Sequence, residues 1–405
     1  MSMIPPAELA PDDEVGDAAH DYERLRDQWL DQLRQVARFA LVADRFWVGY
    51  RPHEVVADDR GRAIVQRVAQ GDVVDSDDRL GLHRVALAPE HDPLSLSLEL
   101  RARDPQARVV PNYVVVPGHH MGFFPHNLPV PARAAPAPPP AADLDERMVI
   151  GVVDTGCLRR HPWWAPQRPV IPADSLETAP SSASQIELGH GTFITGVLRQ
   201  RASGARILHD AAWVVPLAQA PVPLATEWST AQSLLAAAAA GATVINVSMG
   251  TYAPQPLPPL SLRGALDLLE RQYGDDVVVI ASAGNDSTDQ PLFPAAYKPV
   301  VAVGAAFAPV GAPLQRASYS NYGWWVDACA WGSWTSSYFK GRVVPLARRF
   351  DGYARWSGTS FAAPAVAAAV AVDAAATGKP ARRAARDLIA AQAATHVADL
   401  GTYFA

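Results

Sequence analysis

Four short, almost uninterrupted apolar runs in the second half of the chain restrict its fold more than any other feature. Runs of this kind are typical of strands buried on both faces of a parallel sheet. Segments with helical character separate the first three runs. The first of these helices is predicted to begin near Ser229 or Thr230 and to end at Gly241. We therefore predict a doubly wound, mostly parallel α/β domain over residues 148–405, with its site at the carboxyl ends of the strands. The runs are VIGVVD (149–154), TVINVSM (243–249), VVVIASA (277–283) and VVAVGA (300–305).

The residues before this domain divide into three parts. Residues 1–44 form an extension with one amphipathic helix, predicted between Asp21 and Leu41 from the spacing of its apolar residues. Residues 45–116 form a smaller α+β domain, and the closely spaced prolines of residues 117–147 indicate an extended linker. The small domain is predicted to contain strands in RFWVGYRP (45–52), LHRVALAP (82–89) and ARVVPNYVVV (107–116), and a helix in DPLSLSLELRARD (92–104).

Composition narrows the classes of partner. The formal net charge is −6, and no basic stretch is long enough to form a patch, so we expect neither nucleic acid nor a membrane surface as a partner. No run approaches the roughly 18 apolar residues that cross a bilayer. The first residues are acidic where a secretory signal would be basic and then apolar, so we expect a cytoplasmic location. The two cysteines, Cys157 and Cys329, agree with that expectation, and a start further upstream would reopen export.

Polar residues at the ends of apolar segments are the candidates for chemistry. Asp154 ends the first run, His190 lies in ELGHGTFITG, and Ser360 lies in SGTSFAAP at the predicted start of a helix. Taken singly, each has a plain structural alternative, as a turn aspartate, a structural histidine or a helix-capping serine. Together they offer a nucleophile, its general base and a carboxylate that fixes the tautomer of that base. Asn285 follows another buried strand and offers an amide to a developing oxyanion, although it too resembles a turn residue.

Five segments, in chain order, resemble the motifs of the subtilisin-like serine protease (subtilase) family. The resemblance implies a subtilisin-like fold in which Asp154 orients His190, His190 is the general base, Ser360 is the nucleophile and Asn285 donates to the oxyanion. The segments are VVDTG (152–156), GHGTFITG (189–196), NVSMG (246–250), ASAGN (281–285) and SGTSFAAP (357–364).

The same resemblance implies where a peptide substrate lies. Ser248, Met249 and Gly250 match the segment that pairs with an extended substrate backbone, while Ala283 and Gly284 match the wall of the pocket for the residue before the cut. Residues 219–230 would form the opposite rim. Trp228 in that rim is either a substrate contact or a packed aromatic, and we favour the packed aromatic.

The small domain resembles the inhibitory propeptide that precedes many subtilases, with PNYVV as its last strand. The resemblance implies that this domain covers the groove and inhibits its own chain, which makes it an intramolecular partner. We therefore predict self-cleavage between about Val116 and Phe124.

Some positions depart from the family pattern. Phe193 replaces a second histidine and Phe361 replaces a methionine, and both are apolar replacements that need not touch the catalytic residues. Pro364 is expected in the first turn of its helix, where its missing N–H does little harm. Calcium needs six to eight oxygens, and we expect no cofactor or metal. Asp174, Glu177 and Glu187 are the only residues considered for a weak calcium site, and solvated loop charges are the favoured interpretation.

The leading functional prediction is a serine endopeptidase that works through an acyl-enzyme and is regulated by its N-terminal domain. A second enzymatic prediction is acyl transfer to an amine, as in a macrocyclase, or leader removal from a peptide natural product. A third, from another class, is a catalytically silent interaction module. The presence of all three candidate catalytic residues argues against the silent module.

Overall fold

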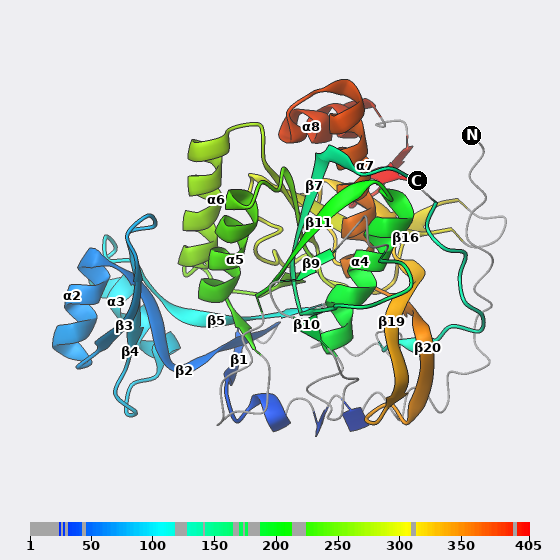
Figure 1. The fold of residues 1–405 in the computed structure, drawn as a ribbon. Helices are drawn as coiled ribbons and strands as arrows, with labels where there is room; N and C mark the ends of the chain where they lie inside the picture. Colours follow the sequence, from blue (N-terminus) through cyan, green and yellow to red (C-terminus); the bar gives the residue numbers. More distant parts are fainter. Residues whose placement is uncertain are drawn as a thin grey trace.

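A computed structural model describes most of the chain (Figure 1). The described residues are 24–25, 27–28, 31–42, 46–117, 128–140, 142–164, 170–172, 175–176, 187–212, 224–308, 313–391 and 395–405.

A ten-stranded sheet, mostly parallel, forms the centre of the larger domain, as the apolar runs predict. Its order is β21-β22-β18-β16-β15-β13-β7-β11-β9, with β17 beside β16, and only the pairs that involve β17 and β21 are antiparallel. The predicted runs correspond to β7, β13, β15 and β16. The strands are β7 (Asp145–Asp154), β9 (Val170–Pro172), β11 (Ala205–Ala211), β13 (Val244–Val247), β15 (Val278–Ser282), β16 (Val300–Phe307), β17 (Gln315–Arg316), β18 (Ala328–Trp331), β21 (His396–Val397) and β22 (Gly401–Phe404).

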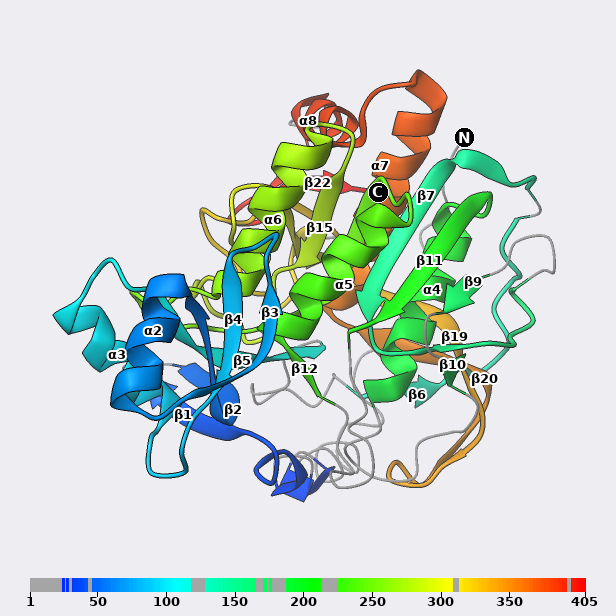
Figure 2. The ribbon, with the colours of Figure 1, turned by 60° about the vertical axis from the view of Figure 1, so that its left-hand side comes forward.

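Helices cover both faces of this sheet (Figure 2). On one face, α5 (Glu227–Ala239) and α6 (Leu260–Tyr273) bury residues such as Val153. On the other, α4 (His190–Arg201) and α7 (Thr359–Thr377) bury Val152 and its neighbours, and α8 (Ala381–Ala391) packs beside α7. Alternate residues of β7 therefore face opposite layers, which defines a doubly wound fold.

The start of α5 differs from its prediction by a few residues. The N-cap is Thr226, whose side chain accepts from the Ser229 N–H while the Ser229 side chain accepts from the Thr226 N–H. This capping box satisfies two amides, so the helix begins at Glu227 rather than after Ser229 or Thr230. Gly241, with φ of +96°, follows the end of the helix as predicted.

Shorter strands extend the larger domain. β19 (Ser333–Val343) and β20 (Arg348–Ser357) form a long hairpin. β6 (Val130–Pro131), from the proline-rich segment, pairs with β20, so this part of the segment is bound to the larger domain. β8 (Cys157–Leu158) pairs with β10 (Ser175–Leu176).

The small domain is an antiparallel sheet with helices on one side, at one end of the molecule (Figure 1, blue and cyan). Its own strands run in the order β5-β2-β4-β3, and β1 pairs with the other end of β2. The domain core contains Val55, Val65 and Leu96. The elements are β1 (Arg38–Val42), β2 (Phe46–Asp58), α2 (Asp59–Val68), β3 (Asp72–Asp77), β4 (Leu82–Ala86), α3 (Pro93–Arg103) and β5 (Val109–Pro117).

The helix predicted from Asp21 to Leu41 is wrong in its second half. Residues 31–33 are helical, but Arg38–Val42 form strand β1, antiparallel to β2. The segment RFALV can alternate sides as a strand, and β2 offers it an unpaired edge, so tertiary pairing overrides the helical spacing. Leu25 and Leu33 belong to the hydrophobic cluster that also contains Val114 and Val116 of β5.

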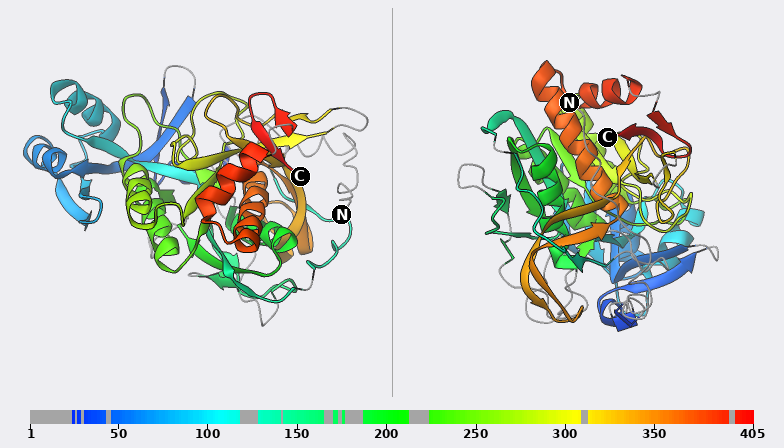
Figure 3. Two further views of the ribbon diagram at one scale, coloured as in Figure 1. Left: turned by 90° about the horizontal axis from the view of Figure 1, so that it is seen from above. Right: turned by 90° about the vertical axis from the view of Figure 1, so that its right-hand side faces the viewer.

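One strand belongs to both domains. β5 leaves the small domain and pairs with β12 (Ala225–Thr226) on one edge and with β14 (Met249–Gly250) on the other, antiparallel to both. Seen from above, β5 (cyan) bridges the two domains (Figure 3, left). A continuous hydrogen-bonded sheet thus joins the small domain to the carboxyl end of β13.

One expectation about membranes needs correction. Within the described residues, Thr359–Thr377 is long and apolar enough, by length and composition, to cross a bilayer. Its most apolar window is 72% buried inside the fold. The hydropathy of α7 is therefore explained by its position under the sheet.

Candidate active site

Asp154 and His190 meet at the carboxyl end of the main sheet. Asp154 is the last residue of β7, and His190 is the first residue of α4. The Nδ1 atom of His190 lies 2.8 Å from Oδ1 of Asp154, and both side chains are buried, with 1% and 0% of their surface exposed. The Thr155 N–H donates to the same oxygen at 2.8 Å. The carboxylate is therefore held on two sides, and it fixes the tautomer of the imidazole with Nδ1 protonated.

Ser360 lies in the first turn of α7, where its hydroxyl is 1% exposed. Its Oγ donates to the Ser248 carbonyl at 3.2 Å. Nε2 of His190 has no hydrogen-bond partner in the described part of the chain. The structure thus joins His190 to Asp154 directly, while the Ser360 hydroxyl donates to the Ser248 carbonyl and not to His190.

The position of Pro364 corrects the sequence expectation. Pro364 is the sixth residue of α7, in its second turn, and cannot donate to the Ser360 carbonyl one turn earlier. The Ser248 hydroxyl donates to that carbonyl instead, at 2.8 Å, and accepts from the Asn246 side chain at 2.9 Å. The missing helical bond therefore creates a polar link between α7 and the strand that bears Ser248.

Asn285 is fixed beside the start of α7. Its Oδ1 accepts from the backbone N–H of Thr359 at 2.9 Å and from the Thr359 hydroxyl at 3.0 Å. The Thr359 hydroxyl also accepts from the Gly284 N–H at 3.1 Å. Because its oxygen is held by an N–H donor, the carboxamide is oriented with its NH₂ group on the other side.

Aromatic rings enclose the imidazole. Trp356 meets His190 nearly edge-on at 5.5 Å between ring centroids, and Phe361 lies at 5.3 Å. Phe361 therefore packs directly on His190. Phe193 makes no such ring contact with His190 and packs against Phe361 at 4.4 Å. These rings make the surroundings of the imidazole apolar, which strengthens its electrostatic interaction with Asp154.

An extended strand already lies beside Ser360. In the pairing of β5 with the larger domain, Val115 faces Ala225 on one edge, and Val116 faces Gly250 on the other. The next pair, Pro117 with Met249, brings the strand to the residue adjacent to Ser248. The segment Ser248–Gly250 and the residues near Thr226, where the sequence predicts the substrate backbone, thus hold β5 between them.

The remaining predicted pocket residues, Ala283 and Gly284, lie near Gly250, since Leu292 is close to both glycines. Ala283 is fully buried, and its carbonyl accepts from the Asn321 side chain at 2.8 Å. Gly284 has φ of +102°, and a Cβ there would lie 2.5 Å from Nδ2 of Asn321, so only glycine fits. Gly250 is restricted in the same way by Leu292, 2.6 Å from an added Cβ.

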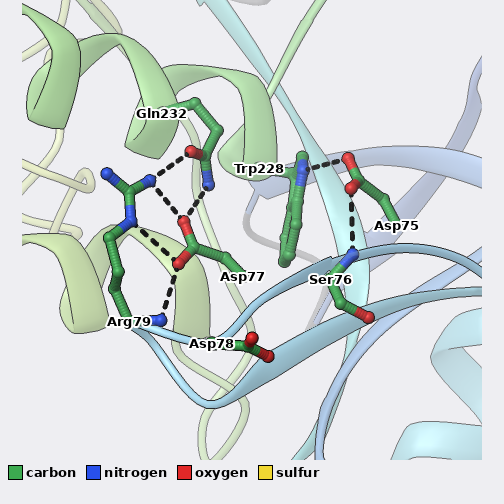
Figure 4. A pocket seen from close by; sticks show the side chains of 7 residues that line it. All are labelled: Asp75, Ser76, Asp77, Asp78, Arg79, Trp228 and Gln232. Carbon is green, nitrogen blue, oxygen red and sulfur yellow. Dashed lines mark hydrogen bonds and ion pairs between the residues drawn. The ribbon is translucent and has the colours of Figure 1, made fainter.

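Trp228 contacts the small domain. It is 5% exposed, and its indole N–H donates to Oδ2 of Asp75 at 3.0 Å (Figure 4). Beside it, Gln232 donates to Asp77 at 2.9 Å and accepts from Arg79 at 2.9 Å. Hydrogen bonding to Arg79 lowers the pKa of Asp77 to about 2. The packed-aromatic interpretation of Trp228 agrees with its burial, and the hairpin of β3 and β4 is its partner.

Sequence reasoning missed the residues that support the predicted ones. Thr359 lies within SGTSFAAP and Asn246 within NVSMG, so both were inside a segment already recognised, and Trp356 immediately precedes SGTSFAAP. Nothing in the sequence marks His209, which lies on the neighbouring strand β11 and is discussed below.

A metal site finds no support in the part of the chain that the structure covers. No group of three or more His, Cys, Asp or Glu side chains there could hold an ion. Asp174 and Glu177 lie outside the described residues, as do residues 118–127, which contain most of the predicted self-cleavage region. Cys157 is fully buried, and burial raises the pKa of its thiol to about 12, as suits a packed apolar residue.

The fold and the strand-end arrangement of aspartate, histidine and helix-start serine define an α/β serine hydrolase type of site. The model of the subtilase family matches residues 145–403, which begins at the first residue of β7, and the chain belongs to that family of subtilisin-like serine proteases.

Relatives agree with this assignment. A thermophilic serine proteinase of Bacillus sp. (strain AK1) is 36% identical over 139 residues, which is 34% of this chain and 29% of that protein. Thermitase of Thermoactinomyces vulgaris is 29% identical over 228 residues, 54% of this chain and 71% of that protein. Fervidolysin from Fervidobacterium pennivorans, a keratinolytic enzyme related to subtilisin, superposes with a TM-score of 0.62 at 19% identity over 87% of this chain and 60% of its own. The chain thus spans less than a third of the first relative and three fifths of the solved structure.

Proposed function

We propose that the chain is a serine endopeptidase whose own N-terminal domain occupies the substrate groove. The observation that carries the proposal is the double pairing of β5, which runs extended between β12 and β14 and approaches Ser248 beside Ser360. Main-chain pairing on two edges holds a peptide with little demand on its sequence. A peptide or protein substrate would take the same path.

The proposed reaction begins at Ser360. Its Oγ leaves the Ser248 carbonyl, bonds to the substrate carbonyl carbon and passes its proton to Nε2 of His190. The C–N bond then breaks, and the leaving amine takes that proton. Water repeats the sequence on the acyl-enzyme, returns a proton through His190 and frees the acid. The orphaned Nε2 atom supports this role, since catalytic hydrogen bonds often close only when substrate binds.

Asp154 and Asn285 would act electrostatically. Asp154 would stabilise the imidazolium that forms on His190, and its Oδ1 atom, which accepts two hydrogen bonds, is already oriented for this role. Asn285 would direct its amide NH₂ to the oxyanion. Its support is the fixed carboxamide oxygen, because a donor that is already oriented costs no rearrangement in the transition state.

The small domain would act as an intramolecular inhibitor. Beyond the strand pairing, Tyr113 of β5 donates its hydroxyl hydrogen to the Leu257 carbonyl at 2.8 Å, and the Trp228 indole bonds to Asp75. Cleavage between about Val116 and Phe124 would release the strand from the chain that follows it. Mass spectrometry of active protein tests this step, and an intact chain with full activity would contradict it.

Labelling by a fluorophosphonate tests the catalytic assignment. The wild-type chain, after self-processing, should take up one equivalent on Ser360 and cleave peptides from a random library. Ser360→Ala should do neither and should remain intact. Ser357→Ala is the matched control, because Ser357 lies three residues away and bonds to the Ser333 hydroxyl at 2.7 Å outside the proposed reaction path. Equal loss in both variants, or cleavage by Ser360→Ala, would refute the assignment.

The product masses separate the alternatives. Hydrolysis adds one water to each cleaved bond, whereas acyl transfer to an amine gives a ligated or cyclic product without that mass. Absence of labelling in the wild type, with and without proteolytic removal of the small domain, would instead identify a silent interaction module.

A further inference from the structure

A second histidine lies under the candidate catalytic pair. His209 is on β11, paired in parallel register with Val152 of β7, two residues before Asp154. Register partners in parallel strands point to the same face, so His209 and Asp154 share the face covered by α4. Strand spacing places their Cα atoms about 8 Å apart. The ring reaches the start of α4, since a Cβ on Gly191 would lie 2.7 Å from Nε2 of His209.

His209 and Asp154 each carry an unsatisfied buried polar atom. His209 is 3% exposed, and in the described part of the chain neither of its ring nitrogens makes a hydrogen bond of normal geometry, although the ring lies close to the Gly191 backbone. Oδ2 of Asp154 also has none, although Oδ1 of the same carboxylate accepts two. Buried polar atoms without partners cost about 1–3 kcal/mol each, so three in one place require an explanation.

The environment keeps the His209 ring neutral. Burial lowers the pKa of His209 to about 4, against the opposing effects of the Asp154 charge and the Gly191 backbone. The titratable group that interacts with it is Asp154 on β7, while its register partner on β9 is the uncharged Pro172. A neutral imidazole has one N–H donor, and Asp154 Oδ2 is an acceptor.

We propose that His209 is a positioning residue whose neutral ring donates, through a single bridging water, to Oδ2 of Asp154 and so fixes the carboxylate that orients His190. This inference rests on the proposed function. A buried water with polar partners on both sides is the usual way in which such atoms are satisfied. The consequence is specific: the hydrogen bond spreads the carboxylate charge, so Asp154 attracts the His190 proton less strongly.

Two substitutions of His209 test the proposal. His209→Leu keeps much of the volume but removes the donor, and His209→Gln keeps a donor. In His209→Leu we expect kcat to fall about tenfold with KM unchanged, because the carboxylate is less well oriented. The acid limb of the pH profile of kcat/KM should move to higher pH, because a carboxylate without this donor attracts the imidazolium more strongly. His209→Gln should restore most of kcat and the wild-type profile.

A packing role alone would give a different result. Equal losses in both variants, or a loss in His209→Leu without a shift of the acid limb, would overturn the proposal. If His209→Leu does not fold, the test uses the far-downfield proton resonance of His190 Nδ1–H. We expect this resonance to be the same in His209→Gln as in the wild type. A changed resonance in that variant would overturn the proposal. Fluorophosphonate labelling of the wild type separates a failure of this proposal from a failure of the proposed function, because only the second would leave Ser360 unlabelled.

Discussion

The candidate active site and the interface with the small domain hold their parts by opposite means. At the site, Asp154, His190 and Asn285 are buried and each is held by a named hydrogen bond at a specific atom. At the interface, β5 is held by main-chain pairing on two edges, with half-exposed polar groups such as Asp75 at its margin. Chemistry requires particular side-chain atoms, whereas docking of a strand requires mainly a backbone. Substitutions should therefore reduce rates at the site and change stability at the interface.

The largest effect is expected for Asp154→Asn. An amide in place of the carboxylate favours the wrong tautomer of His190 and cannot stabilise the imidazolium. By analogy with other serine proteases, kcat should fall about 10⁴-fold. Steady-state kinetics with a peptide substrate measures this, and thermal unfolding serves as the control. If Asp154→Asn kept a tenth of the wild-type rate, the site would not be more sensitive to substitution than the interface, and the comparison would fail.

Asn285→Ala should have the next largest effect. Removal of such a donor costs about 10²–10³ in kcat in subtilisin itself, and KM should change little because the donor acts on the transition state. Asn285→Asp is a useful companion, because it retains the acceptor for Thr359 but places a negative charge near the oxyanion. A rise in KM without loss of kcat would instead indicate a role in ground-state binding.

At the interface, Glu227 provides a pH-dependent test. It is fully buried, its Oε2 accepts from the Ser261 N–H at 2.8 Å, and Tyr113 of β5 and Tyr297 lie close enough to interact with its charge. Burial raises the pKa of Glu227 from 4.5 to about 8. The folded chain therefore binds this proton more tightly than the unfolded chain. The stability that it contributes is complete below about pH 4.5 and is lost as the pH rises to about 8.

Glu227→Gln should remove this dependence. As the pH rises from 4.5 to 8, the unfolding free energy of the wild type should fall relative to that of the variant, by no more than about 1.4 kcal/mol per pH unit. Denaturant unfolding at several pH values measures it. Parallel curves for the two proteins would show that the carboxyl does not titrate in this range.

The smallest effect is expected for Trp228→Phe. The indole N–H bond to Asp75 is lost, but most of the ring packing is retained, so unfolding should become easier by about 1 kcal/mol. Asp75→Asn, which retains an acceptor, should cost less. Denaturant unfolding gives both values, and peptide turnover by processed protein should be unchanged. A large loss of turnover in Trp228→Phe would mean that the indole contacts substrate.

The errors of sequence-based prediction fall where partners come from elsewhere in the chain. Arg38–Val42 has helical spacing but becomes a strand because β2 offers an edge. Pro364 lies deeper in its helix than expected, because the Ser248 hydroxyl replaces the helical donor to Ser360. The contact of Phe361 with His190 is not such an error, but it too comes from the packing of α7 on α4, which no local pattern encodes.

The sequence by itself determined the doubly wound sheet, the positions of Asp154, His190, Ser360 and Asn285 at the ends of apolar segments, and the family. Burial on both faces and helix periodicity are local properties, so they can be read from consecutive residues. Only the tertiary structure decided that β5 lies between β12 and β14, that the Ser360 hydroxyl turns to Ser248, and that His209 shares a sheet face with Asp154. Those contacts join residues far apart in the chain. The periodicity of a segment specifies which face of a helix or strand a side chain lies on, but not which residue it contacts there.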